Sequence, residues 1–273
     1  MKLKRKNIII LCILLISIIC IIIAVIHIIQ WNNDNKHTQK MIDDISQIVD
    51  VEERPDSENG NIEVVEPVEE IPEADPYWDY IKMNLIHVDF KELKNINPST
   101  VGWIQVNGTN INYPFVQAEN NQYYLTHSYD KSYNSAGWVF LDYRNNLSTL
   151  DKNTIIYAHG RLDTTMFGSL KNILTSGWLI NQNNYVIKLS TEYENTLWQV
   201  FSVYRIPTTN DYIRTNFKNS QNFLEFANML IDRSAHNFNT KVNENDHILT
   251  LSTCYNDNEK VVLHAKLIKR EAR

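Results

Sequence analysis

The chain has 273 residues and a net charge of −6, and this charge is unevenly distributed. Residues 41–75 contain thirteen Asp or Glu residues and one basic residue, whereas residues 76–273 are close to neutral. A nearly neutral segment of this length can fold around one substantial core, and it offers no basic surface for binding nucleic acid.

The cysteines exclude a disulfide-stapled fold. Cys12 and Cys20 lie in an apolar segment near the N-terminus, and Cys254 is the only cysteine in residues 76–273. Those residues therefore cannot form an internal disulfide, and their Cys and His residues show no metal-ligand spacing. We expect no metal site.

The N-terminal region is typical of a membrane anchor. Four basic residues within residues 1–7 precede an apolar run at residues 8–29, interrupted only by Ser17 and His27. As a helix this run is about 33 Å long, enough for a bilayer core of about 30 Å. No small-residue cleavage site follows it, and Trp31 suits the membrane interface. We expect an uncleaved signal-anchor at residues 8–30, a cytoplasmic tail at residues 1–7 and the remaining chain outside the cell membrane.

Residues 31–75 predict a stalk between the anchor and the folded domain. Their acidic composition and three prolines (Pro55, Pro67 and Pro72) leave too little apolar surface to order the segment by itself. Residues 41–51 are compatible with a short helix, whereas residues 52–75 indicate a solvated, self-repelling spacer.

Residues 76–273 read as one mainly β domain with added helices. Apolar residues at approximate helical spacing predict a helix over residues 77–95. The Asn107-Gly108 pair predicts a hairpin turn, and eight short strands of even spacing suggest a closed barrel or a sandwich. We place these strands at residues 102–106, 111–116, 136–142, 154–158, 185–189, 197–204, 247–253 and 261–268. A long insertion before residue 247 contains a helix whose apolar face carries Phe223, Phe226, Ala227, Leu230 and Ile231.

Two residues at strand ends are candidates for chemistry. Cys254 ends the strand 247–253, and an unpaired thiol there is either a nucleophile or a buried small hydrophobe. His159 ends the strand 154–158 and precedes Gly160, which favours an exposed imidazole in a loop. Spacing alone does not distinguish His159 from His127 or His264.

The segments around these two residues resemble those of the class B sortases. Residues 250–254 read TLSTC, which matches the sortase signature TLxTC, and residues 155–160 read IIYAHG with MFGSL at residues 166–170. The family's histidine segment is similar, IIYGHN followed by MFG.L. Further similarity lies in Asn112-Tyr113-Pro114, Ala136-Gly137, residues 141–145 and residues 211–215, so that the resemblance covers essentially all of residues 76–273.

This resemblance implies a closed eight-stranded sortase-type barrel with an N-terminal helix and a helix in the insertion. It also implies a cysteine transpeptidase that needs no cofactor. Cys254 would attack the threonine carbonyl of a C-terminal NPxTx-like sorting signal on a secreted protein, and His159 would protonate the leaving amine. A peptidoglycan precursor or cross-bridge amine, or a pilin lysine, would then resolve the thioacyl-enzyme.

One residue departs from the family pattern. The strand after the cysteine begins with Lys260 where the family has an arginine, and the loop between cysteine and cation is short. Lys keeps the charge but lacks the planar fork that holds two acceptors. Three interpretations are open: Lys260 substitutes for the arginine with reduced activity, which we favour; Arg214 or Arg161 reaches the site instead; or the enzyme is impaired. Lys260 could also be an ordinary solvated residue at a strand start.

Substrate contacts can be carried over from the family by position only. They fall on Asn112, Val116, Thr208, Tyr212 and Ile213, together with Ser252 and Tyr255 beside the cysteine. Each could equally be structural, most of all Val116 and Ile213. Two rival functions follow from Lys260 and from the thiol: a sortase-fold protein that binds sorting signals without turnover, and a membrane-anchored cysteine hydrolase that uses water as the acceptor.

Overall fold

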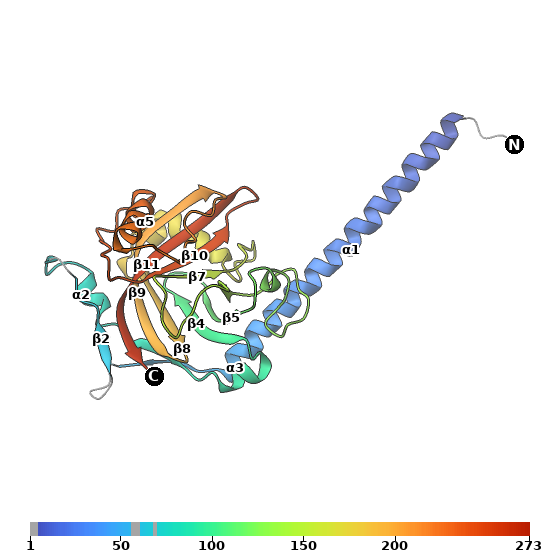
Figure 1. Ribbon diagram of the computed structural model, residues 1–273. Coiled ribbons are helices and arrows are strands. Elements are labelled where there is room, and N and C mark those ends of the chain that lie inside the picture. The colour runs from blue at the N-terminus through green and yellow to red at the C-terminus, as the bar shows by residue number, and fades with distance from the viewer. Residues whose placement is uncertain (1–4, 56–60, 68–69) are drawn as a thin grey trace.

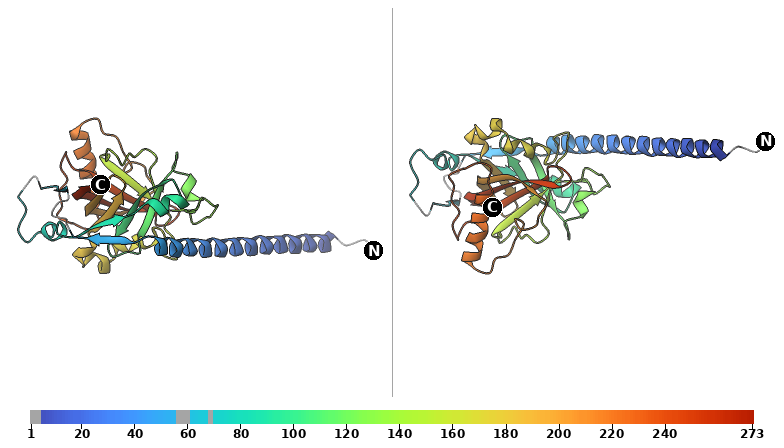
Figure 2. Two further views of the ribbon diagram at one scale, coloured as in Figure 1. Left: turned by 90° about the horizontal axis from the view of Figure 1, so that it is seen from below. Right: turned by 90° about the horizontal axis from the view of Figure 1, so that it is seen from above.

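The computed structural model describes residues 5–55, 61–67 and 70–273. It shows a long N-terminal helix, α1 (Arg5–Ile48), that extends away from a β-barrel domain (Figure 1). The two further views in Figure 2 show the same arrangement, with the N-terminal end of α1 pointing away from the barrel. Residues 1–4 of the expected cytoplasmic tail, and residues 56–60 and 68–69 of the expected stalk, lie outside the described residues.

Eight strands form the closed barrel. Neighbouring strands follow the order β10-β7-β6-β5-β4-β8-β9-β11, and β11 pairs with β10 to close the ring. The predicted eight-stranded barrel is confirmed. The strands are β4 (Thr100–Val106), β5 (Asn112–Gln117), β6 (Phe140–Leu141), β7 (Asn153–Tyr157), β8 (Val186–Thr191), β9 (Glu194–Pro207), β10 (Ile248–Cys254) and β11 (Glu259–Ala272).

The long strands β9 and β11 are buried over most of their length because both of their faces are covered. One face contributes to the barrel interior, and the other packs against the predicted insertion helix, α5 (Ser220–Asp232). Phe223, Phe226 and Leu230 of α5 join Phe201 and Val262 in this second apolar cluster. The helix prediction in the insertion is therefore confirmed. Short helical turns connect the other strands, namely η1 (Tyr123–Leu125), η2 (Gly168–Leu174), α4 (Ser176–Leu179) and η3 (Gln182–Asn184).

The single helix predicted over residues 77–95 is wrong. The segment instead forms α2 (Tyr77–Tyr80), β3 (Leu85–Val88) and α3 (Lys91–Ile96). β3 pairs antiparallel with β1 (Val51–Arg54) and buries three of its four residues. This pairing joins segments distant in the sequence, so that local spacing could not indicate it. The strand predicted at residues 136–142 is also shorter than expected, at Phe140–Leu141.

The expected solvated stalk needs a similar correction. Residues 31–48 continue α1, β1 pairs with β3, and β2 (Ile62–Val64) pairs with the outer edge of β11. The short helix expected near residues 41–51 is thus the end of a much longer one. An acidic segment that cannot bury its own surface can still be ordered when the domain supplies strands for its backbone to pair with.

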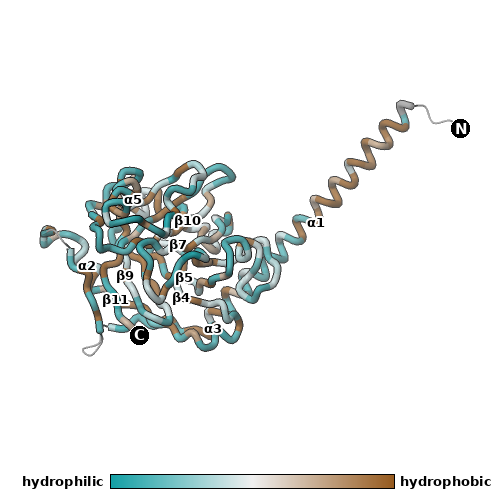
Figure 3. Tube along the Cα trace, viewed as in Figure 1, coloured by the Kyte–Doolittle hydropathy of each residue, from teal (hydrophilic) through white to brown (hydrophobic). Residues whose placement is uncertain are grey.

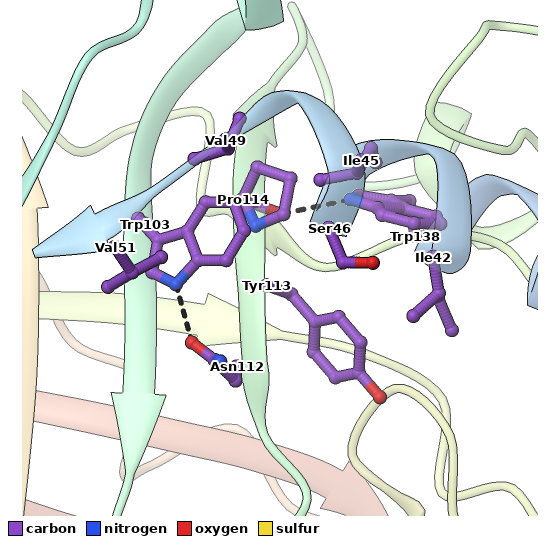
Figure 4. A pocket seen from close by; sticks show the side chains of 10 residues that line it. All are labelled: Ile42, Ile45, Ser46, Val49, Val51, Trp103, Asn112, Tyr113, Pro114 and Trp138. Carbon is purple, nitrogen blue, oxygen red and sulfur yellow. Dashed lines mark hydrogen bonds between the residues drawn. The ribbon is translucent and has the colours of Figure 1, made fainter.

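The end of α1 nearest the barrel lies against the domain. Ile42, Ile45 and Val49 face the aromatic side chains of Trp103 and Trp138 across a cavity of about 240 Å³ (Figure 4). Ile45 and Thr38 are buried there. Figure 3 shows that this part of α1 is more polar than the apolar stretch that projects beyond the domain. Within the described residues, α1 is the one helix that is long and apolar enough to cross a membrane.

Candidate active site

The registers of three strands bring Cys254, His159 and Lys260 to one end of the barrel. β10 runs parallel to β7 with Ser252 opposite Tyr157, so that Cys254 and His159 each follow two residues later. β11 runs antiparallel to β10 with Lys260 directly opposite Cys254. Residues directly opposite on neighbouring strands project to the same face of a sheet. The three side chains therefore share one site, although they are far apart in the sequence.

Gly160 allows the ends of β7 and β10 to approach closely. A Cβ atom at this position would lie 2.1 Å from the carbonyl oxygen of Cys254, closer than any side chain can tolerate. Beside it, the Thr253 hydroxyl donates a hydrogen bond of 2.8 Å to the carbonyl oxygen of Ala158. The two strand ends are thus held together immediately next to the thiol and the imidazole.

The His159 ring is oriented by a backbone carbonyl. Its Nε2 lies 2.8 Å from the carbonyl oxygen of Leu125, and His159 is partly buried. A carbonyl oxygen only accepts hydrogen bonds, so Nε2 carries a proton in this arrangement. Nδ1 is then the ring nitrogen that can accept or release a proton during a reaction.

Lys260 contacts the sulfur directly. Its Nζ lies 2.9 Å from Sγ of Cys254, where an ammonium can donate a hydrogen bond to the sulfur. Such a bond is stronger when the acceptor carries a negative charge, so Lys260 is placed to stabilise negative charge on the sulfur during a reaction. Thiolate is the reactive form of cysteine.

The two arginines considered as replacements have other partners. The guanidinium of Arg161 forms an ion pair of 2.7 Å with Asp163 and also binds Asn35. Arg214 donates a hydrogen bond of 2.6 Å to Asn222 and lies over two aromatic rings next to α5. The cation shown in contact with Sγ is that of Lys260.

A cleft of about 590 Å³ opens beside the sulfur. Its wall includes a residue from α1, Trp31. The lining residues are Trp31, Ser135, His159, Gly160, Arg161, Leu162, Asp163, Cys254, Tyr255, Asn256 and Asp257.

Of the predicted substrate contacts, Tyr255 lies in this cleft. The ring is 36% exposed, and the guanidinium of Arg205 lies 3.9 Å from its centroid, with Lys171 Nζ at 5.6 Å. Arg205 also forms an ion pair with Glu259. The aromatic side chain is therefore flanked by two cations at the edge of the cleft.

Ser252 and Tyr212 lie behind the nucleophile and are buried. Their hydroxyl groups form a hydrogen bond of 2.9 Å. Burial, with a further contribution from the nearby Cys254, raises the pKa of Tyr212 above its ordinary value. The pair supports the strand that carries Cys254 and remains neutral at physiological pH.

Thr208 and Ile213 lie in the loop between β9 and α5. The Thr208 amide donates a hydrogen bond of 2.9 Å to the Asn258 carbonyl oxygen, which ties this loop to the turn between β10 and β11. The carbonyl oxygen of Ile213 accepts a hydrogen bond of 2.9 Å from Arg144. The first contact places Thr208 beside the turn that follows Cys254, and the second places Ile213 next to Arg144. Neither residue is among those that line the cleft.

The structure does not bring Asn112 and Val116 into the cleft with Cys254. Asn112 accepts a hydrogen bond of 2.7 Å from the Trp103 indole and lines the cavity beneath α1 (Figure 4). Val116 is fully buried in the barrel core. Within the described residues, no group of three His, Cys, Asp or Glu side chains is placed to hold a metal ion.

Comparison with known proteins identifies the family. Residues 104–268 match the family model described as the sortase domain. Sortase B of Staphylococcus aureus is 36% identical over 188 residues, which cover 67% of this chain and 76% of the relative. Sortase B of Listeria monocytogenes is 30% identical over 242 residues, 87% of this chain and 87% of the relative. The structure of a Staphylococcus aureus sortase B–substrate complex has a TM-score of 0.62 at 36% identity, covering 66% of this chain and 84% of that chain.

The chain belongs to the sortase family, as a class B member. It is accordingly a cysteine transpeptidase.

Sequence reasoning missed three features of this sortase. Arg205 gave no signal in the sequence, and the pairing of β9 with β11 is what places it near Tyr255. The sequence predicts Trp31 at the membrane interface but gives no sign that it also lines the cleft. The carbonyl of Leu125 belongs to η1, a short helical turn without any motif, and its contact with His159 depends on the tertiary fold.

Proposed function

We propose that this sortase cleaves a C-terminal NPxTx-like sorting signal after its threonine and transfers the secreted protein to a cell-wall amine. The observation that carries the proposal is the contact of 2.9 Å between Lys260 Nζ and Cys254 Sγ, in the cleft that also contains His159. It provides an activated sulfur next to an imidazole whose orientation is fixed.

The reaction would proceed in two acyl transfers. Cys254 Sγ attacks the threonine carbonyl carbon, the peptide C–N bond breaks, and the leaving amine takes a proton from His159. An incoming amine then attacks the thioester and gives a proton back to His159, and the sulfur leaves as a thiolate. Lys260 stabilises that thiolate in the resting enzyme and again when the sulfur departs.

Lys260 would also assist the oxyanion that forms at the substrate carbonyl, the role given to the family's arginine. A lysine supplies one compact charge, whereas an arginine can hold two acceptors at once. Because the Lys260 ammonium already contacts Sγ, we expect an active enzyme in which sulfur and oxyanion share one cation.

We further propose that α1 anchors the enzyme in the cell membrane, with residues 1–7 in the cytoplasm and the barrel outside. The apolar run at residues 8–29, the four basic residues before it and Trp31 after it support this orientation. The substrates would then be secreted proteins and wall components outside the same membrane.

The test is mass spectrometry of the full-length protein in detergent with an NPQTN-type peptide. We expect a covalent acyl adduct on Cys254 and, when a glycine-based amine is added, a transfer product. Cys254→Ala should abolish both, whereas Cys20→Ala should leave both unchanged. Hydrolysis alone in the presence of the amine would support the hydrolase, and binding of the peptide without an adduct would support the non-catalytic alternative.

A further inference from the structure

The apolar run and the segment that contacts the catalytic domain belong to one continuous helix, α1. The apolar run ends at residue 29, and Asp34 already accepts hydrogen bonds from the Ser135 amide at 3.1 Å and hydroxyl at 2.5 Å. Five helical residues correspond to a rise of about 7.5 Å. The barrel is therefore held within roughly two helical turns of the end of the apolar run.

Several contacts make this junction rigid. Asn35 binds Arg161, and His37 lies 3.0 Å from Asp130. The Asn134 side chain donates hydrogen bonds to the Asp34 carbonyl and to the Thr38 hydroxyl, each at 3.1 Å. Two loops of the domain, residues 130–135 and 159–163, thus hold α1 just beyond its apolar stretch (Figures 1 and 3).

These same loops expose large apolar or aromatic side chains. Leu162 is 93% exposed, Tyr133 is 63% exposed, and Trp31 on α1 is 56% exposed. Leu162 and Trp31 line the cleft that contains Cys254, and Leu162 directly follows the arginine that binds α1. Tyr133 lies two residues before Ser135, which binds Asp34. A single exposed leucine is unremarkable in a soluble protein, but here three such residues surround the base of a candidate membrane helix.

We propose that Trp31, Tyr133 and Leu162 form a rim that inserts into the interfacial layer of the lipid bilayer, so that the catalytic cleft opens at the membrane surface. This inference rests on the membrane anchoring proposed above. The bilayer is the occupant because the helix that binds both loops continues into the apolar segment within two helical turns. Tyr and Trp prefer this layer, and a leucine beside them gains from leaving water.

The rim has a consequence for substrates. A cleft held at the interface receives polypeptides and amines that are themselves attached to the membrane, at a fixed height above the hydrocarbon. Trp31 would be shared between the lipid and the cleft, because it lines the cleft and follows the apolar run.

The test uses the full-length chain with Cys12→Ala, Cys20→Ala and Cys254→Ala, which removes the native thiols. Leu162→Cys is labelled with an environment-sensitive fluorophore, and the protein is reconstituted into phosphatidylcholine–phosphatidylglycerol vesicles that contain nitroxide lipids. The matched control is Ile180→Cys. Ile180 is 85% exposed, follows α4, and lies beside Tyr185 and His236 rather than in either of the two loops that bind α1.

We expect a blue-shifted emission and at least threefold stronger lipid quenching at position 162 than at position 180. A polar helical insertion of seven residues between Gln30 and Trp31 raises the domain by about 10 Å and should remove the difference. Equal quenching at both positions would overturn the proposal. A blue shift at position 162 without lipid quenching would also overturn it, because the label would then be covered by protein and not by lipid.

The readout does not need catalysis, so it separates the rim from the proposed reaction. Absence of the peptide adduct would refute the reaction and leave the quenching result intact. Failure of the full-length chain to float with the vesicles would refute the membrane anchor and the rim together.

Discussion

Gly160→Ala should inactivate the enzyme without removing any group that takes part in the reaction. The new Cβ would lie 2.1 Å from the carbonyl oxygen of Cys254, whereas an ordinary contact begins at 3.4 Å. Relief of this clash requires the segment after β7 to move away from the end of β10 by more than 1 Å. That segment carries His159 and β10 carries Cys254, so the movement separates the base from the nucleophile. A misplacement of about 1 Å can cost about 100-fold in rate.

The assay is kcat/KM for cleavage of the sorting peptide, with the thermal midpoint measured on the same samples. Gly177→Ala in α4 is the matched control, because its Cβ would meet no atom within 4 Å. We expect the control to retain full activity and to gain up to about 1 kcal/mol in stability from helix propensity. Gly160→Ala should lose about 100-fold in kcat/KM.

Loss of folding is distinguished by a second measurement on Gly160→Ala. A folded variant retains the near-ultraviolet circular dichroism of its buried aromatic side chains and its reaction of Cys254 with an alkylating agent. The geometric explanation is refuted if the variant keeps its kcat/KM within threefold of the natural enzyme, because the strand ends would then tolerate separation.

Three further outcomes follow from individual contacts. Lys260→Gln should slow both the alkylation of Cys254 and the formation of the peptide adduct by at least tenfold, whereas Lys260→Arg should restore adduct formation. An unchanged alkylation rate in Lys260→Gln would argue against the contact between Lys260 and the sulfur. Arg144→Gln removes a 2.7 Å ion pair from the fully buried Asp142 and should cost about 1.5–3 kcal/mol in urea unfolding; a loss below 0.5 kcal/mol would contradict this. Burial lowers the pKa of His264 from 6.5 to about 3, so the unfolded chain binds the extra proton and stability falls as pH drops from about 6.5 towards 3. His264→Met should flatten this fall by about 1.4 kcal/mol per pH unit, and equal slopes would refute it.

The titration of His264 depends on contacts that suit only the neutral ring. The Thr250 hydroxyl donates its proton to Asn153 at 2.7 Å, so it must accept from His264 Nδ1 at 2.9 Å. The Tyr204 hydroxyl then donates to Nε2 at 2.8 Å. A second ring proton would oppose the Tyr204 donor inside the apolar cluster under α5, which explains why the ring stays uncharged.

The barrel could be predicted from the sequence because its strands depend on local patterns. Alternation of apolar residues, the Asn107-Gly108 turn and the apolar face of the insertion helix act over a few residues each. The structure confirms the eight-stranded barrel and α5. The predicted strand ends differ from the observed ones by several residues, most of all at β9 and β11. The pairing between these two strands extends beyond their apolar centres.

The errors arose where order comes from distant partners. The apolar spacing around β3 predicts a helix, and only its pairing with β1 shows that it is a strand. β1 itself lies in an acidic segment whose composition predicts no ordered structure. The docking of α1 has the same origin. Its polar residues Asp34 and His37 bind loops about a hundred residues away in the sequence.

The candidate site was only partly predictable. The resemblance to the family selected Cys254, His159 and Lys260, and the structure places all three at one end of the barrel. Two of the substrate contacts that were assigned from the family by position do not lie in the cleft. Asn112 lies beneath α1, and Val116 lies in the core. A position in a motif does not indicate which way a side chain faces when a nearby helix covers that strand.

The short turn between β10 and β11 explains why a lysine can stand where the family has an arginine. The turn places residue 260 directly opposite Cys254, at the closest cross-strand position. From there a single ammonium reaches the sulfur at 2.9 Å, so the charge needed to hold a thiolate is supplied by register rather than by the length of the side chain. The planar fork of an arginine would add a second donor for the oxyanion, not a better contact with the sulfur. Replacement of Lys260 by arginine should therefore affect the acyl-transfer steps more than the ionisation of the nucleophile.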